Sequence, residues 1–242
     1  MEQGPAGGPL SKPLDQAAFS ATKHLLQEQI NRVSIKKLIA WWCISLLAVL
    51  VAIAASVQWL DMPIAQYFLR ISAHIAAMSG PLGSYELVTA DVLLMVALAM
   101  IRIVRGFMPD YSKAVFVACG ASLLAFTLND YTLKIIFGRY NPHVFFTIQP
   151  DRLFNFMHGD QTSAFPSGHM VMVTAFAAVL VRAYFRTWPL FASLLSLAAI
   201  LLVLGDWHFL SDVIAGIFVG GTVGLMAGEL WCEHVQRYTL RI

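Results

Sequence analysis

Apolar residues gather in long uninterrupted runs along this chain instead of alternating with polar ones. Residues 38–57 contain no charged side chain. Twenty helical residues rise about 30 Å, which matches the hydrocarbon core of a bilayer. Five further runs follow, at 86–104, 114–134, 167–185, 188–205 and 211–231. Because backbone in lipid must satisfy its own hydrogen bonds, each run is predicted to be a helix. The expected fold class is all-α, a polytopic membrane protein with six transmembrane helices in one bundle.

Polar stretches flank this predicted membrane domain, which covers residues 38–231. Residues 1–37 are expected to form a cytoplasmic N-terminal tail, and residues 232–242 a cytoplasmic C-terminal tail. Apolar positions at helical spacing within 17–34 fit either an amphipathic helix on the membrane surface or a solvated tail. Residues 61–84 are expected to form an outer re-entrant or interfacial piece, broken by a Gly-Pro pair.

The composition agrees with a membrane protein. Apolar residues make up 58% of the chain and charged residues 12%, with a mean hydropathy of +0.69. Soluble domains are roughly 45–50% apolar and about 25% charged. These values exclude a soluble enzyme, a disordered chain and a disulfide scaffold. A net charge of +2 gives no indication of a nucleic-acid partner.

The positive charges are unevenly distributed between the two predicted sides of the membrane. Twelve of the 16 Lys and Arg residues fall on the side that holds both termini. The other side has Arg70, Lys134, Arg139 and Arg152. Lys and Arg favour the cytoplasmic side of a membrane. We therefore expect a multi-pass protein of the cell inner (plasma) membrane, with cytoplasmic termini and a site facing the periplasm or exterior.

The start of the fourth predicted span is suited to an anion. Ser167 and Gly168 come directly before its apolar run, where a helix N-terminus presents free backbone N–H groups and the positive end of its dipole. The glycine allows close approach, and the serine adds a hydroxyl donor. His169 follows in the first turn, at the outer membrane surface.

The last predicted span begins with a second histidine. His208 and Asp212 are four residues apart, so on a helix they share a face and the carboxylate can orient the imidazole. Such a histidine is a better nucleophile or base. Lys134 and Arg139, at the end of the third span, supply cations with no acidic partner close in the sequence. This set suits phosphoryl transfer, in which one histidine attacks phosphorus and the other protonates the leaving oxygen.

Taken in order, these segments resemble the three motifs of the type 2 phosphatidic acid phosphatase superfamily, the integral-membrane lipid phosphatases. The family pattern is Lys, six residues, Arg-Pro; then Pro-Ser-Gly-His; then Ser-Arg, five residues, His, three residues, Asp. The resemblance covers roughly residues 110–230 and implies that His208 forms a phosphohistidine, Asp212 orients it and His169 is the general acid. It implies that the phosphate is bound by Ser167, Gly168 and Lys134. It implies no metal and no other cofactor.

The chain departs from the family pattern twice. Asn141 stands where the first motif has arginine, and is either a substrate contact or a turn residue. Arg139 is then either the substitute for substrate binding or a second basic residue. Leu202 stands at the arginine of the third motif, and the replacement donor is left open among Arg152, His143 and His158. A charged hydrogen bond contributes ~1.5–3 kcal/mol, so its loss lowers the rate by about one to two decades. The pattern resembles a divergent bacterial branch.

The resemblance implies a metal-independent lipid phosphatase that hydrolyses a phosphomonoester or diphosphate. The lipid is left open among phosphatidate, phosphatidylglycerophosphate, an isoprenoid diphosphate and a lipid A phosphate. Two alternatives remain: a lipid phosphotransferase with the same histidine chemistry, and a degenerate, non-catalytic lipid-binding member. The expected partners are the lipid phosphate and the bilayer.

One further pattern concerns packing. Four glycines recur every four residues along the last span, in the row of His208 and Asp212: Gly216, Gly220, Gly224 and Gly228. A ridge without side chains lets another helix approach closely. We expect it to seat a neighbouring helix of the same chain, with a homodimer through the ridge as the alternative.

Overall fold

The computed structural model describes residues 36–37, 39–72 and 84–239. The chain divides into two units, Met1–Ala48 and Val49–Ile242, and the candidate site lies wholly in the second. The predicted amphipathic segment 17–34 lies outside the described residues, as do residues 73–83 of the outer piece expected at 61–84.

The fold class is confirmed, since the described residues form helices and no strands. Five of these helices are long and apolar enough to cross a membrane, and a sixth apolar helix, Gly168–Ala183, is shorter. The five are Ile39–Arg70, Ser84–Arg105, Asp110–Ile148, Phe185–Leu204 and Leu210–Glu233. The chain is therefore a polytopic membrane protein.

The first span does not end at residue 57, as the charge pattern suggested. The helix continues through a π-helical turn, η1 (Ser56–Leu60), into α2 (Asp61–Ser72). A single aspartate after an apolar run normally indicates the point at which a membrane-spanning helix reaches water. Here the Asp61 side chain is instead buried and paired, so its charge does not stop the helix.

The third span bends into a long connection, residues 138–167, which leads to the next apolar helix. Helix α4 (Asp110–Leu128) passes through a π turn, η2 (Asn129–Leu133), into α5 (Lys134–Phe137). Gly138 then ends the helix in the left-handed region, with φ +53°, a conformation that glycine adopts at little cost. The chain continues into a short helix, α6 (Pro142–Ile148), before it returns to the core.

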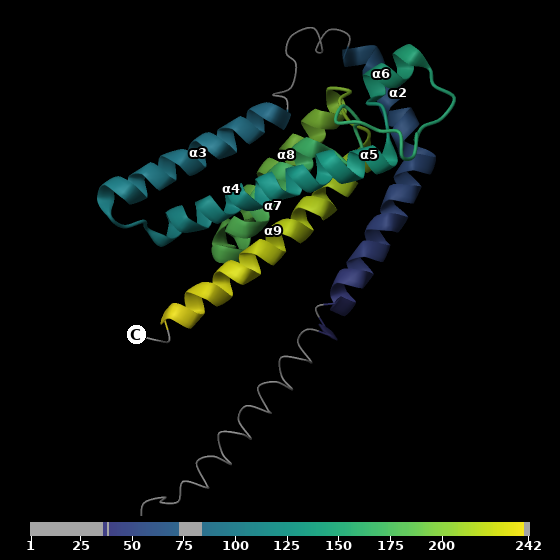
Figure 1. Cartoon of the computed structure of the whole chain (residues 1–242). Helices are drawn as coiled ribbons and strands as arrows, with labels where there is room; N and C mark the ends of the chain where they lie inside the picture. The colour runs from purple at the N-terminus through teal and green to yellow at the C-terminus, as the bar shows by residue number, and fades with distance from the viewer. Residues whose placement is uncertain (1–35, 38, 73–83, 240–242) are drawn as a thin grey trace, which may run out of the picture. The chain divides into compact units, whose positions relative to one another are not determined.

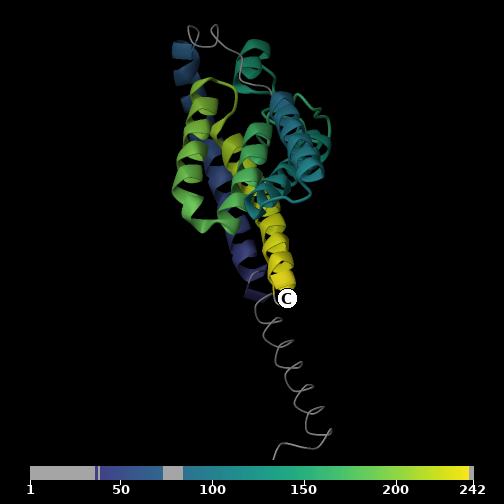
Figure 2. The same cartoon turned by 90° about the vertical axis from the view of Figure 1, so that its left-hand side faces the viewer.

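Three helices form the centre of the second unit. Helix α7 (Gly168–Ala183) packs against both α4 and α9 (Leu210–Thr239), and the three lie side by side in both views (Figure 1, Figure 2). Helix α9 continues as helix to residue 239, beyond the end of the span predicted at 231. Helix α3 (Ser84–Arg105) packs outside this centre, mainly against α4, and α8 (Trp188–Leu204) packs outside it, mainly against α7.

The glycine ridge of α9 faces α7 of the same chain. A Cβ atom at Gly216 would lie 2.8 Å from Met170 Cβ, and one at Gly220 would overlap the Val171 carbonyl oxygen. Gly224 lies equally close to the backbone of α7. The predicted internal neighbour is therefore α7. A homodimer through the ridge would have to displace this helix, and we do not propose it.

Candidate active site

The N-terminus of α7 is held against the start of α9. Ser167 is the N-cap of α7 and is fully buried. Its backbone N–H donates to the Asp212 carbonyl oxygen over 3.0 Å, and its hydroxyl accepts from Met170 N–H over 3.4 Å. The backbone N–H groups of the first turn of a helix point toward its N-terminal end, and Gly168 opens α7. The predicted anion site is thus fixed directly beside the predicted histidine pair.

The two histidines predicted from different motifs lie in one place. The ring centroids of His169 and His208 are 5.8 Å apart, and the ring planes meet at 71°. His208 is nearly buried, with 8% of its surface exposed. Two imidazoles at this distance can act on opposite sides of one phosphorus atom, as an in-line displacement requires.

Asp212 lies on the Nδ1 side of His208. The distance from His208 Nδ1 to Asp212 Oδ2 is 3.6 Å, longer than a hydrogen bond but within ion-pair range. The same carboxylate oxygen accepts the Phe209 backbone N–H over 2.9 Å, which fixes its orientation. Since the carboxylate faces Nδ1, Nε2 is the nitrogen of His208 left for chemistry.

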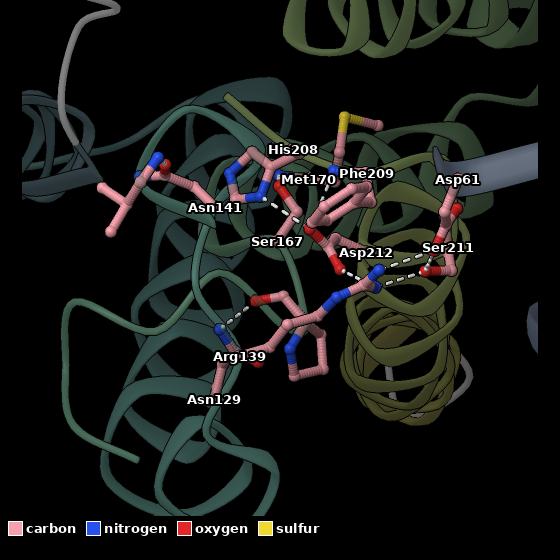
Figure 3. Close-up of polar contacts among 12 residues, drawn as sticks. Asp61, Asn129, Arg139, Asn141, Ser167, Met170, His208, Phe209, Ser211 and Asp212 are labelled. Carbon is pink, nitrogen blue, oxygen red and sulfur yellow. Dashed lines mark hydrogen bonds and ion pairs between the residues drawn. The ribbon is translucent and has the colours of Figure 1, made fainter. Parts of the chain in front are cut away.

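Arg139 binds Asp212 from the side opposite to the histidine (Figure 3). Its Nη1 donates to Asp212 Oδ1 over 2.7 Å and to Ser211 Oγ over 2.6 Å. Its Nη2 donates to Asp61 Oδ2 over 2.7 Å. The arginine and both carboxylates are fully buried. The guanidinium therefore joins two carboxylates from distant segments, and its side chain is closed off from solvent.

Two aromatic rings cover this ion-pair network. The guanidinium carbon of Arg139 lies 4.0 Å from the centre of the Phe209 ring and 4.9 Å from that of Phe154. Phe154 comes from the long connection 138–167, in which the Asn155 N–H also donates to the Gly138 carbonyl oxygen over 2.8 Å. This connection therefore covers the ion-pair network.

The sequence analysis did not identify Asp61 as part of the site. Its Oδ1 accepts from the Ser211 backbone N–H over 3.0 Å and from the Ser56 hydroxyl over 2.7 Å, while its Oδ2 accepts from Arg139 and the Ser211 hydroxyl. An acid inside an apolar stretch is by itself a functional signal. Two of its partners, Arg139 and Ser211, are 78 and 150 residues away, and nothing in the local sequence indicates them.

Lys134 has an acidic partner, contrary to the expectation. Its Nζ lies 2.5 Å from Asp130 Oδ1, four residues earlier on the same face, and donates to the Gln161 carbonyl oxygen over 3.0 Å. Arg139 has no acidic partner close in the sequence, as expected, but folding brings it to the carboxylates of Asp61 and Asp212. Lys134 Nζ also lies near Gly168, 3.6 Å from where a Cβ would stand. The Lys134 ammonium group therefore lies beside the predicted anion site, and the Asp130 carboxylate already compensates its charge.

The remaining predicted positions have local roles in the structure. Asn141 is the N-cap of α6, with its side-chain oxygen accepting the Val144 N–H over 2.8 Å. Leu202, at the position of the missing arginine, packs in an apolar cluster with Met170 and Val213. The three candidate replacement donors are all exposed: Arg152, His143 and His158.

Asp206 lies buried in the turn before His208. Only 2% of its surface is exposed, its φ is +62°, and neither carboxylate oxygen has a hydrogen-bond partner. Burial raises the pKa of Asp206 from 3.8 to about 6, while the charge of His143 acts in the opposite direction. The carboxyl is therefore easily protonated next to the candidate nucleophile.

Within the described part of the chain, no three His, Cys, Asp or Glu side chains are grouped so as to hold a metal ion. The expectation of chemistry without a metal remains a prediction.

The comparisons with known proteins assign the chain to a family. A family model described as the PAP2 superfamily matches residues 112–232, half of the chain. Neither the curated proteins nor the solved structures include a match to this chain. The matched region contains both histidines, Asp212, Lys134 and Arg139, but not Asp61. The chain belongs to the PAP2 superfamily, a family of phosphatase-type phosphoesterases.

Proposed function

We propose that this protein is a lipid phosphatase that works through a phosphohistidine on His208. The observation that carries the proposal is the pairing of His169 and His208 at 5.8 Å, at the N-terminus of α7. The phosphate would sit against the Gly168 and His169 N–H groups, the Ser167 hydroxyl and Lys134 Nζ. These groups would stabilise the charge on its equatorial oxygens.

In the first step His208 Nε2 attacks phosphorus, and the bond from phosphorus to the lipid oxygen breaks. Protonated His169 gives its proton to that oxygen, so that the lipid leaves as an alcohol. Asp212 holds the proton on Nδ1 and offsets the positive charge that develops on the ring. A phosphomonoester and a diphosphate can react in the same way, with a phosphate as leaving group in the second case.

In the second step water replaces the lipid. Neutral His169 takes a proton from the water, the water oxygen bonds to phosphorus, and the bond from phosphorus to Nε2 breaks. Inorganic phosphate leaves and both histidines return to their starting states. An alcohol in place of water would give the phosphotransferase reaction, and the reaction product tells the two apart.

Arg139, expected to bind substrate, is better assigned as a positioning residue. Both of its terminal nitrogens are occupied by carboxylate or hydroxyl oxygens inside the protein. It would act through Asp212, which it holds on the far side from His208. Asn141 remains a candidate substrate contact only through the amide nitrogen, because its oxygen caps α6.

We also propose the sidedness inferred from the Lys and Arg distribution. The site would face the periplasm or exterior of an inner (plasma) membrane, with both termini in the cytoplasm. A lipid substrate would then enter sideways from the outer leaflet.

One observation favours a second candidate function. Lys134 is paired with Asp130, Arg139 is sealed behind Asp212, and Leu202 replaces the motif arginine. A site with so little free positive charge also suits a lipid-binding protein without turnover. This candidate differs from the first in forming no phosphoenzyme.

The test is phosphate release from a panel of lipid phosphates by the purified protein, together with trapping of the phosphoenzyme from a ³²P-labelled lipid phosphate. We expect acid-labile, alkali-stable label on wild type and none on His208→Ala. Asp212→Asn should lower kcat by at least about tenfold. Glu229→Gln is the matched control, because that carboxylate pairs with Arg182 roughly 25 Å further along α9. Label on His208→Ala would refute the nucleophile, and a wild type without label or release would favour the binding protein.

A further inference from the structure

A cavity of about 320 Å³ lies between α3, α4, α7 and α8. Its volume is at the lower end of those that hold small ligands in proteins, about 300–1,000 Å³. The wall is apolar at nearly every position, and leucine and phenylalanine side chains form half of it. Two of its lining residues are polar, Asp91 on α3 and Ser122 on α4. No step of the proposed phosphatase reaction uses this cavity.

The cavity is built on helices that also reach the candidate phosphate site. A Cβ atom at Gly168 would lie 3.0 Å from Ser84 Oγ and 3.6 Å from Lys134 Nζ, so these three residues converge. Ser84 begins α3, and Asp91 follows it by seven residues. Seven residues make two turns, so Asp91 lies on the same helix face about 10 Å deeper. Leu87, another lining residue, lies between them on that face.

Asp91 has hydrogen-bonding capacity left over for a ligand. The buried Ser122 hydroxyl group lines the same cavity as Asp91. A carboxylate has about four acceptor positions, so one neighbouring hydroxyl can occupy only part of it. The side chain is partly exposed and lines the cavity. An acid kept among apolar side chains at membrane depth indicates a function.

We propose that this cavity binds the hydrocarbon chain of the lipid phosphate, and that Asp91 selects a chain with a hydroxyl group about 10 Å from phosphorus. This inference rests on the proposed phosphatase function. The apolar wall fits methylene groups, which excludes ionic or sugar-like ligands. A hydroxyl both donates and accepts, so it pairs with the Asp91 carboxyl in either protonation state. An ester carbonyl can only accept a hydrogen bond, so it cannot pair with an ionised Asp91 carboxylate. A plain hydrocarbon chain would make no hydrogen bond to Asp91 at all.

The test compares three single-chain substrates in mixed detergent micelles: dodecyl phosphate, 3-hydroxydodecyl phosphate and 8-hydroxydodecyl phosphate. An extended chain advances about 1.2 Å per bond, so a 10 Å span corresponds to about eight or nine bonds. The 8-hydroxyl lies at this depth and the 3-hydroxyl does not. We expect wild type to show about tenfold higher kcat/KM for the 8-hydroxy substrate than for the other two. Only this substrate can form the buried hydrogen bond between its hydroxyl group and Asp91.

Two variants separate recognition from folding. Asp91→Leu should abolish the tenfold preference while it leaves hydrolysis of p-nitrophenyl phosphate, which has no chain, unchanged. Ala198→Phe should fill the cavity from α8 and lower kcat/KM for all three dodecyl substrates, again with p-nitrophenyl phosphate unaffected. Thr89→Val is the matched control on α3, because this exposed residue bonds its own helix backbone and does not line the cavity.

The outcomes are distinct. Equal kcat/KM for the 8-hydroxy and plain substrates in wild type overturns the inference, without any variant having to fold. So does a preference that survives in Asp91→Leu. If wild type releases phosphate from no substrate, including p-nitrophenyl phosphate, the proposed phosphatase function fails instead.

Discussion

Replacing Arg139 by methionine tests how the histidine end of α9 is held in place. The side chains of Arg139, Asp61 and Asp212 are all fully buried. Methionine keeps much of the volume and removes the charge, which leaves two carboxylates without a counter-ion. Removing one partner of a buried ion pair costs about 3–5 kcal/mol. Because two carboxylates lose their partner here, we expect a loss near 5 kcal/mol.

For a chain of this size, 1 kcal/mol shifts Tm by about 2–4 °C. Arg139→Met should therefore lower Tm by about 10–20 °C, measured by circular dichroism of the purified protein in detergent. Arg182→Met is the control. Arg182 makes a two-pronged pair with Glu229 of similar lengths, 2.8 and 2.7 Å, but these side chains are 39% and 47% exposed. Exposed pairs contribute about 0–1 kcal/mol, so that variant should lose less than about 4 °C.

A double-mutant cycle makes the reasoning refutable. In the wild-type background, Asp61→Asn removes a charged hydrogen bond and should cost about 1.5–3 kcal/mol. In the Arg139→Met background the same change removes a charge that has lost its partner, so it should be neutral or stabilising. An equal cost of Asp61→Asn in both backgrounds would show that Arg139 does not neutralise Asp61, and the network as described would be wrong.

Three further predictions concern single sites. Burial raises the pKa of Asp206 from 3.8 to about 6, so the free energy of unfolding of wild type falls by about 3 kcal/mol as the pH rises between these values, and it stays at the lower level above them. The Tm of Asp206→Asn should therefore lie about 6–12 °C above that of wild type at pH 8 and close to it at pH 4. A Tm difference that does not depend on pH would contradict this. Gly220→Ala should lower Tm because its Cβ meets the backbone of α7, whereas Gly221→Ala, with ordinary contacts only, should hold or raise it; equal shifts would argue against the ridge. Asp130→Asn should lower the inhibition constant of inorganic phosphate severalfold, because Lys134 loses its carboxylate partner; an unchanged constant would mean that Lys134 does not face the phosphate.

The sequence by itself predicted the helices and most of their ends. Six apolar runs, each about as long as a bilayer is thick, predict helices whatever their neighbours are, because the backbone must bond internally in lipid. The spacing of His208 and Asp212 on one helix face is equally local. The Lys134–Asp130 pair is also local, since a spacing of four residues brings both side chains to one helix face.

Only the tertiary structure decided how the charges are paired. The sequence places Arg139 among the candidate cations for substrate, and it ends the first span at residue 57, before Asp61. Folding brings Arg139 to Asp212 across 73 residues and Asp61 to Ser211 across 150 residues, so the Arg139 guanidinium pairs with buried carboxylates instead of a free anion. A buried charge is tolerable only beside its counter-charge. Which residues meet depends on helix packing, here the approach of α7 to the glycine ridge of α9, and not on any local pattern.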